Sequence, residues 1–183
     1  MISERLAMDP ETRDGHEARI LAGISSAIAD VRGLTISGYW PVQGEPDLRE
    51  YLKALPARGG RAALPAVVRP HHPLVFRAWR PGEPLTPDAQ NLPAPPASAE
   101  ELKPDVLLVP LVGFDPAGYR LGYGGGYFDR TIAAFSTRPR VIGVGYDQAR
   151  IPSVRPQPHD RRMDLVVTES GIHVSPPPHH PIP

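Results

Sequence analysis

The run DVLLVPLVGF (105–114) is the most apolar stretch of the chain, and it constrains the fold more than any other feature. A strand with one face in water alternates apolar and polar side chains, whereas a strand covered on both faces is apolar throughout. The run is much shorter than the roughly 20 apolar residues of a membrane span. It therefore predicts a buried strand of a parallel sheet, with helices on both faces.

Helices and strands alternate on both sides of this run. Asp9 is a good N-cap, Pro10 suits the first helical position, and apolar residues then recur at helical spacing until Gly33. This order of elements favours an α/β fold with a mostly parallel sheet. The other expected helices are 47–55 and 128–135, and the expected strands are 34–40, 61–67, 73–79, 140–146 and, as the last strand, 164–169.

Prolines mark two further segments. Residues 80–104 hold a proline every few positions, which excludes a long helix or a central strand and predicts an ordered surface loop. The tail SPPPHHPIP (175–183) is expected to be disordered, with His179 and His180 solvated rather than bound to a metal. We therefore expect a single domain, residues 1–174, followed by this tail.

Charge and cysteine content exclude several classes of function. The 20 basic and 20 acidic side chains give a formal net charge of +0, so no overall basic field attracts nucleic acid or an anionic membrane. The absence of cysteine excludes disulfides, thiolate metal sites and a cysteine nucleophile. The first ten residues are polar, unlike a signal peptide. We expect a cytoplasmic protein that holds any anionic ligand by local geometry.

The glycine loop RLGYGGGYFDR (120–130) follows the buried run, at the edge of the sheet where ligands of open α/β folds bind. Gly122, Gly124, Gly125 and Gly126 can adopt positive φ angles and bring backbone N–H groups close to an oxyanion. The helix expected directly after the loop would favour the same anion with its free N–H groups. The loop is therefore a candidate phosphate site.

Charged side chains flank these glycines. Arg120 and Arg130 offer planar guanidinium groups suited to phosphate oxygens, and Asp129 is a candidate Mg²⁺ ligand. The loop departs from two common phosphate-binding patterns, because Tyr127 replaces the third glycine of GxGxxG and no lysine completes GxxxxGK[ST]. A glycine-rich turn with a purely structural role has the same composition. The residues alone leave both interpretations open.

The segment VPLVGFDPAGYRLGYGGGYFDR (109–130) resembles the signature of the 5-formyltetrahydrofolate cyclo-ligase family, also called methenyltetrahydrofolate synthetases. The resemblance continues in VIGVGYDQ (141–148), in HDRRMDLVVTE (159–169) and, upstream, in GYWPVQGEPDLREYL (38–52). It covers the chain from about residue 10 to residue 172. The family's fold is a three-layer α/β sandwich, which agrees with the alternation of strands and helices.

The resemblance implies an activity. Members of the family use ATP and Mg²⁺ to convert 5-formyltetrahydrofolate to 5,10-methenyltetrahydrofolate, releasing ADP and phosphate. The formyl oxygen attacks the γ-phosphate, N10 of the folate then closes the ring, and phosphate leaves. The expected ligands are thus a reduced folate, ATP and Mg²⁺, with neither nucleic acid nor membrane as partner. For the assembly we expect a monomer or a weak homodimer.

The same resemblance implies roles for residues on the nucleotide side. Arg120 and the loop from Gly122 to Tyr127 would hold the ATP phosphates, and Asp129 and Asp160 would be the Mg²⁺ ligands. Arg120, Tyr127 and Asp129 would act in catalysis. By residue type alone, Asp160 is equally compatible with a loop cap.

On the folate side, the resemblance implies that Glu45 binds the pterin ring, since a carboxylate matches its N–H donors. Trp40, Tyr123 and Phe128 would line the same pocket, Phe128 standing where many members have a second tyrosine. By residue type alone, Glu45 beside Pro46 is also compatible with a turn, and Trp40 with the core.

The chain departs from the family pattern at three places. Members usually begin with a short helix carrying K-x-x-x-R that reaches the nucleotide, whereas this chain has Arg5 and Arg13 but no lysine before Lys53. Ala94 stands where many members have a glutamate, and Gly125 where many have a lysine. We expect either that the segment lies upstream of Met1 or that the ATP site is weaker.

These departures leave other functions open. One is a paralogue of the family, in thiamin metabolism for example, that binds a phosphorylated or pterin-like ligand without cyclo-ligase activity. Another is an isomerase or transferase of a related fold that acts on a phosphosugar, but Lys103 is poorly placed for such chemistry. A pure binding module agrees less well with the polar groups concentrated around one glycine loop.

Overall fold

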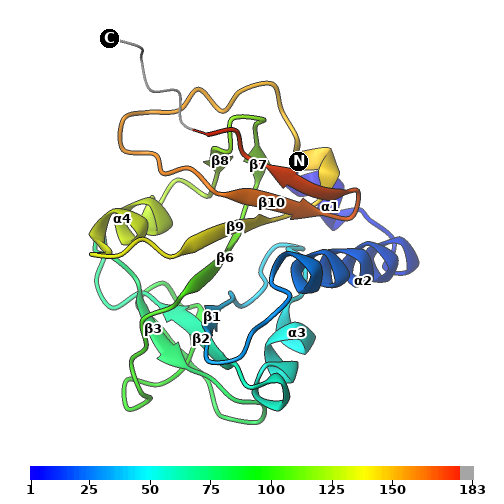
Figure 1. Cartoon of the computed structure of the whole chain (residues 1–183). Coiled ribbons are helices and arrows are strands. Elements are labelled where there is room, and N and C mark those ends of the chain that lie inside the picture. The colour runs from blue at the N-terminus through cyan, green and yellow to red at the C-terminus, as the bar shows by residue number, and fades with distance from the viewer. Residues whose placement is uncertain (178–183) are drawn as a thin grey trace.

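The apolar run forms β6 (Val106–Pro110), which lies in the middle of a seven-stranded sheet of order β11-β10-β9-β6-β1-β2-β3 (Figure 1). It pairs in parallel with β1 (Thr35–Ser37) on one side and with β9 (Arg140–Val144) on the other. The prediction of a buried parallel strand is confirmed.

The inner part of the sheet, from β2 through β1, β6 and β9 to β10, is parallel throughout. Only the two edge strands, β3 and β11, pair antiparallel with their neighbours. The sheet is therefore mostly parallel, as expected. The remaining strands of the sheet are β2 (Arg61–Ala66), β3 (Val75–Ala78), β10 (Leu165–Thr168) and β11 (Gly171–Val174).

Helices cover both faces of the sheet, as Figure 1 shows. Side chains of β6 alternate: Leu108 packs in the core that includes residues of α2 (Pro10–Ala27) and α3 (Arg49–Ala54). Its neighbour Leu107 packs in a second core on the opposite face, which includes residues of α4 (Tyr127–Ala134). The three-layer α/β sandwich of a single domain is confirmed.

The first long helix begins where the sequence predicts but ends earlier. The Asp9 side chain accepts a hydrogen bond from Thr12 N at 2.9 Å and caps α2. The helix ends at Ala27 rather than close to Gly33. Ile28 and Val31 nevertheless stay buried in the turn that follows, which explains why the apolar spacing continues beyond the helix.

Several short elements were not predicted. Helix α1 (Ile2–Leu6) precedes α2, and β11 follows β10, so the expectation that residues 164–169 form the last strand is wrong. These pieces have too few residues to show a clear period in the sequence. The other short elements are β4 (Thr86–Pro87), β5 (Pro93–Ala94), β7 (Gly113–Phe114), β8 (Arg120–Leu121) and the 3₁₀ turns Pro56–Arg58 and Asp147–Ala149.

The structure is a computed structural model that describes residues 1–177. The expectations for His179, His180 and the end of the proline-rich tail lie outside the described residues. Residues 80–104 form an ordered surface segment, as predicted, that contains β4 and β5. Within the described part of the chain, no helix combines the length and the apolar character needed to cross a membrane.

Candidate functional site

The glycine loop lies beyond the carboxyl end of β6. The hairpin β7–β8 leads into it, and α4 begins immediately after it. Gly124 has φ +88° and Gly126 φ +62°, whereas Gly122 and Gly125 do not use positive φ. A Cβ atom at Gly122 or Gly124 would meet no other atom within 4 Å, so the loop borders open space. A ligand can therefore approach its backbone.

Helix α4 begins without a side-chain cap. Its N-cap is Gly126, which has no side chain to accept a hydrogen bond from the first N–H groups of the helix. These donors and the positive end of the helix dipole favour an anion at this point. The structure thus places the glycines and the helix start together, as the sequence predicts.

An ion pair between a buried arginine and a partly buried aspartate joins the two ends of the glycine loop. The Arg120 side chain is 5% exposed, and its Nη2 donates to Asp129 Oδ2 at 3.0 Å. Burial lowers the pKa of Arg120 and the Asp129 carboxylate opposes that shift. The guanidinium group remains charged all the same, because arginine is not deprotonated in proteins. Arg120 therefore holds the two ends of the glycine loop together in this structure.

The same two side chains bind the segment that carries Asp160. Arg161 N donates to Asp129 Oδ1 at 2.8 Å, and Arg120 Nη1 donates to Arg161 O at 3.2 Å. Asp160 Oδ2 accepts a hydrogen bond from Gln157 N at 2.7 Å. The negative charge of Asp160, like that of Asp129, opposes the lowering of the Arg120 pKa by burial. Both predicted metal ligands therefore act on one buried cation.

The carboxylates of Asp129 and Asp160 would hold Mg²⁺ only together with phosphate oxygens of a bound ligand. Among residues 1–177 no group of three or more His, Asp or Glu side chains is arranged to hold a metal. Mg²⁺ is, however, usually bound by one or two carboxylates, with phosphate oxygens and water completing the octahedron. Asp129 and Asp160 supply two carboxylates, the number that this pattern needs, but their oxygens already accept hydrogen bonds from Arg120, Arg161 N and Gln157 N, and their role as metal ligands stays a prediction.

Glu45 lies on the other side of the loop and is almost completely buried, at 4% exposure. Its Oε2 accepts a hydrogen bond from Val42 N at 2.9 Å, and its Oε1 accepts one from the Tyr123 hydroxyl at 2.7 Å. Burial raises the pKa of Glu45, and the two hydrogen bonds and Arg5 oppose the rise. The structure thus brings together Glu45 and the glycine loop, although Glu45 and Tyr123 are 78 positions apart.

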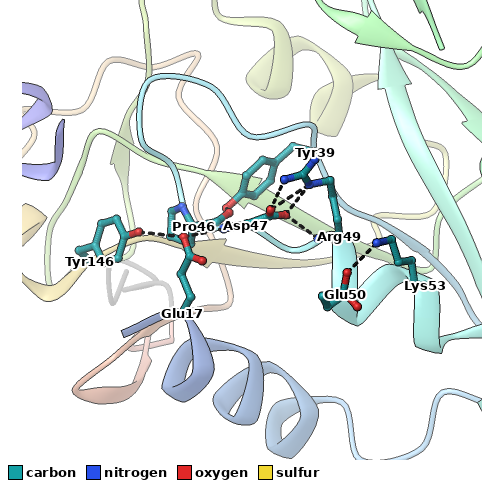
Figure 2. A network of polar contacts seen from close by, with 8 residues as sticks. All are labelled: Glu17, Tyr39, Pro46, Asp47, Arg49, Glu50, Lys53 and Tyr146. Carbon is teal, nitrogen blue, oxygen red and sulfur yellow. Dashed lines mark hydrogen bonds and ion pairs between the residues drawn. The ribbon is translucent and has the colours of Figure 1, made fainter. Parts of the chain in front are cut away.

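The segment around Glu45 is held by a polar network, shown in Figure 2. Glu17 Oε1 of α2 accepts a hydrogen bond from Asp47 N at 3.2 Å. The Tyr39 hydroxyl donates to Pro46 O at 2.9 Å, and Asp47 forms an ion pair with Arg49 at the start of α3. These contacts fix the backbone on the carboxyl side of Glu45.

Arg5 of α1 enters the site from the N-terminal end and is only 4% exposed. Its Nε donates to Gln43 O at 2.7 Å, its Nη1 donates to Leu111 O at 3.2 Å, and its Nη2 donates to the Tyr123 hydroxyl. Sequence reasoning noted Arg5 only as a nearby cation. A single arginine in a five-residue helix carries no sequence signal of burial.

The aromatic residues expected around the pterin are less closely grouped. Trp40 packs edge-to-face on Trp79, with ring centroids 6.4 Å apart, and Arg49 lies over its ring at 5.0 Å. Phe128 lies 5.8 Å from the Arg120 guanidinium carbon and packs on the core beneath α4. Of these three aromatic residues, Tyr123 is the one that forms a hydrogen bond with Glu45. The pterin roles of Trp40 and Phe128 stay predictions.

These features define an α/β protein with a glycine loop and a buried carboxylate at the carboxyl edge of a parallel sheet. The sequence model of the 5-formyltetrahydrofolate cyclo-ligase family matches residues 1–169. The chain therefore belongs to this family, and the resemblance found in the sequence is confirmed.

Individual relatives agree with this assignment. The chain is 31% identical to a 5-formyltetrahydrofolate cyclo-ligase of Mycolicibacterium smegmatis, over 92% of this chain and 89% of the relative. It is 27% identical to the Escherichia coli K12 protein of the same name, over 92% of this chain and 96% of the relative. The alternative of a paralogue without the activity is not favoured by these relatives.

Solved structures support the fold. A 5,10-methenyltetrahydrofolate synthetase of Aquifex aeolicus matches with a TM-score of 0.81 and 22% identity, over 99% of this chain and 92% of that protein. The corresponding synthetase of Mycoplasma pneumoniae matches with a TM-score of 0.74 and 21% identity, over 92% and 93%.

The buried state of Glu45 gives a first testable prediction, for Glu45→Gln. Burial raises the pKa of Glu45, so ionisation of this group costs folding stability as the pH rises above the ordinary carboxyl value of about 4.3. Glutamine is neutral at every pH. The free energy of unfolding of Glu45→Gln minus that of the wild type should therefore increase between pH 4 and pH 7, measured by urea denaturation.

The matched control is Glu101→Gln, because the Glu101 residue is exposed to solvent. The free energy of unfolding of Glu101→Gln minus that of the wild type gives the baseline for the loss of a carboxylate at the surface. A Glu45→Gln difference that changes with pH no more than this baseline would contradict the raised pKa of Glu45.

Proposed function

We propose that the chain is an ATP- and Mg²⁺-dependent 5-formyltetrahydrofolate cyclo-ligase, which forms 5,10-methenyltetrahydrofolate, ADP and phosphate. The observation that carries this proposal is the 2.7 Å hydrogen bond between Tyr123 of the glycine loop and the buried Glu45. The loop proposed to bind phosphate and the carboxylate proposed to bind the pterin ring thus border one site. The reaction requires that the nucleotide and the folate bind side by side.

On the nucleotide side, the backbone N–H groups from Gly122 to Tyr127 and the start of α4 would bind the ATP phosphates. Asp129 and Asp160 would hold Mg²⁺, which neutralises charge on the phosphate oxygens when bound. Arg120 would keep the loop and Asp129 in position through its ion pair.

On the folate side, the Glu45 carboxylate would accept hydrogen bonds from the pterin ring. Tyr123, Trp40 and Phe128 would provide aromatic surface for the ring, with Tyr123 directly beside Glu45. The family relatives named for this reaction cover nearly the whole chain, which supports the assignment of both halves of the site to one substrate pair.

The chemistry needs no covalent bond to the protein. The formyl oxygen attacks the γ-phosphorus, and the bond from that phosphorus to the bridging oxygen of ADP breaks. N10 of the folate then attacks the activated formyl carbon, loses its proton, and phosphate leaves with the former formyl oxygen. The protein contributes the approach of the two substrates and charge stabilisation. This agrees with a chain that has no cysteine nucleophile.

The proposed activity also indicates the substrates, the partners and the cellular location of the enzyme. The substrates are a reduced folate and ATP, both small and anionic, and the balanced surface charge gives no reason to expect nucleic acid as a partner. We assign it to the cytoplasm as a monomer or weak homodimer.

The proposal predicts that the purified protein forms 5,10-methenyltetrahydrofolate from 5-formyltetrahydrofolate, ATP and Mg²⁺. The product is followed by its absorbance, and mixtures without ATP serve as the control. Glu45→Gln should raise KM for the folate more than it lowers kcat, because it weakens a contact to the pterin ring rather than to the reacting atoms. Absence of product together with absence of ATP binding by calorimetry would contradict the proposal.

The metal assignment is best tested at Asp160. Removing the Asp129 carboxylate would leave Arg120 buried without its partner and destabilise the fold, which confuses the result. Asp160→Asn should instead raise the Mg²⁺ concentration needed for half-maximal ATP binding by about tenfold, equivalent to roughly 1.4 kcal/mol.

Calorimetric titration of ATP at several Mg²⁺ concentrations provides the measurement. Asp14→Asn on the exposed side of α2 is the matched control and should leave the Mg²⁺ dependence unchanged. An unchanged Mg²⁺ dependence in Asp160→Asn would show that Asp160 is not a metal ligand.

A further inference from the structure

Arg5 is a buried cation that borders Glu45 and the glycine loop. It reaches the carboxyl edge of the sheet, since its Nη1 donates at 3.2 Å to Leu111 O directly after β6. Its Nε donates at 2.7 Å to Gln43 O, two positions before Glu45. A side chain that is 4% exposed and hydrogen-bonded to two segments far apart in the sequence has a fixed place.

The third contact of Arg5 fixes the direction of a hydrogen-bonded chain. A guanidinium group can only donate, so the Tyr123 oxygen must accept from Arg5 Nη2. The single hydroxyl proton of Tyr123 is then left for Glu45 Oε1, to which it donates at 2.7 Å. Arg5 therefore orients Tyr123, and Tyr123 orients one carboxylate oxygen of Glu45.

The charged and titratable groups around Glu45 come from four elements. Arg5 lies on α1, Tyr123 in the glycine loop, Tyr39 beyond the end of β1, and Arg13 on α2. Arg13 Nη1 donates at 3.2 Å to Gly44 O, and Arg13 Nη2 donates to Arg5 O, so its charge is directed to backbone carbonyl groups. Burial and the Glu45 charge both raise the pKa of Tyr39, so this phenol stays neutral. Arg5 is thus the cation that acts on the Glu45 carboxylate.

We propose that Arg5 is a positioning residue for the folate substrate, which aligns Glu45 for the pterin ring through the Tyr123 hydroxyl. This inference rests on the proposed function and adds a residue to it. It assigns Arg5 to the folate half of the site and not to the nucleotide phosphates. Two of the three contacts of Arg5 lie beside Glu45: Gln43 O is two positions before Glu45, and the Tyr123 hydroxyl donates to Glu45 Oε1.

The test compares steady-state kinetics of Arg5→Met and Arg5→Lys with the wild type over a range of pH. Arg5→Met should raise KM for 5-formyltetrahydrofolate about tenfold or more, as expected for a lost charged hydrogen bond. KM for ATP should stay within about twofold, because Arg5 contacts the Tyr123 hydroxyl and not the backbone N–H groups of the loop that are proposed to bind phosphate. Arg5→Lys, which keeps the charge, should recover part of the loss.

The pH profile separates this role from a purely structural one. Arg5 lowers the pKa of Glu45, so its removal should move the acidic limb of kcat/KM for the folate to higher pH. Arg19→Met, at an exposed position of α2, is the control and should move neither KM nor the limb. A loss of kcat with both KM values and the acidic limb unchanged would overturn the proposal.

A second variant keeps the test decisive if Arg5→Met does not fold. Tyr123→Phe retains the buried charge and breaks the hydrogen-bonded chain on a loop residue that is 47% exposed. It should raise KM for the folate in the same direction. A lower folate KM in either variant would mean that Arg5 blocks the pocket, and would overturn the inference.

Different results would refute the proposed function and the role of Arg5. A wild-type protein that neither binds 5-formyltetrahydrofolate by calorimetry nor turns it over would refute the proposed function. A wild-type protein that does both, with Arg5 and Tyr123 variants of unchanged folate KM and pH profile, would refute only the role of Arg5.

Discussion

The ion pair between the buried Arg120 and the partly buried Asp129 is the interaction on which the site depends. The two residues lie nine positions apart, one at each end of the glycine loop, so their contact closes the loop at its base. Arg161 joins the same pair through its backbone N–H and carbonyl group, which fixes the Asp160 segment beside the loop. The Arg120 guanidinium thus helps to fix the glycine loop and the segments that carry both candidate metal ligands, Asp129 and Asp160.

The sheet supplies the second half of the arrangement. β1 and β6 are parallel neighbours, so their carboxyl ends meet at the same edge. The segment after β1 carries Glu45, and the segment after β6 leads to the glycine loop. Tyr123 joins the two through a hydrogen bond to Glu45. Topology therefore places the buried carboxylate of Glu45 next to the glycine loop, and α1 completes the border with Arg5.

Much of this could be predicted from the sequence, because long or strongly patterned segments carry their own signal. The apolar run predicted β6, Asp9 and Pro10 predicted the start of α2, and the glycine loop was correctly expected beyond the carboxyl end of β6 and before a helix. The family resemblance then implied Glu45 and Asp160, and it was correct about the family. The pairing of Arg120 with Asp129 was not predicted, since both were assigned directly to ligands and burial of an arginine leaves no trace in sequence. Arg5 and β11 were missed because their elements are too short to show a period.

The proposed mechanism requires that the protein bring the formyl oxygen of the folate to the γ-phosphorus of ATP, so that the two form a new bond. The most direct test uses 5-formyltetrahydrofolate labelled with ¹⁸O in the formyl group, with mass spectrometry of the phosphate released in one turnover. One ¹⁸O atom is expected in each phosphate, because the formyl oxygen forms the new bond to phosphorus and leaves with it. Unlabelled phosphate, with the label released as water, would contradict this mechanism.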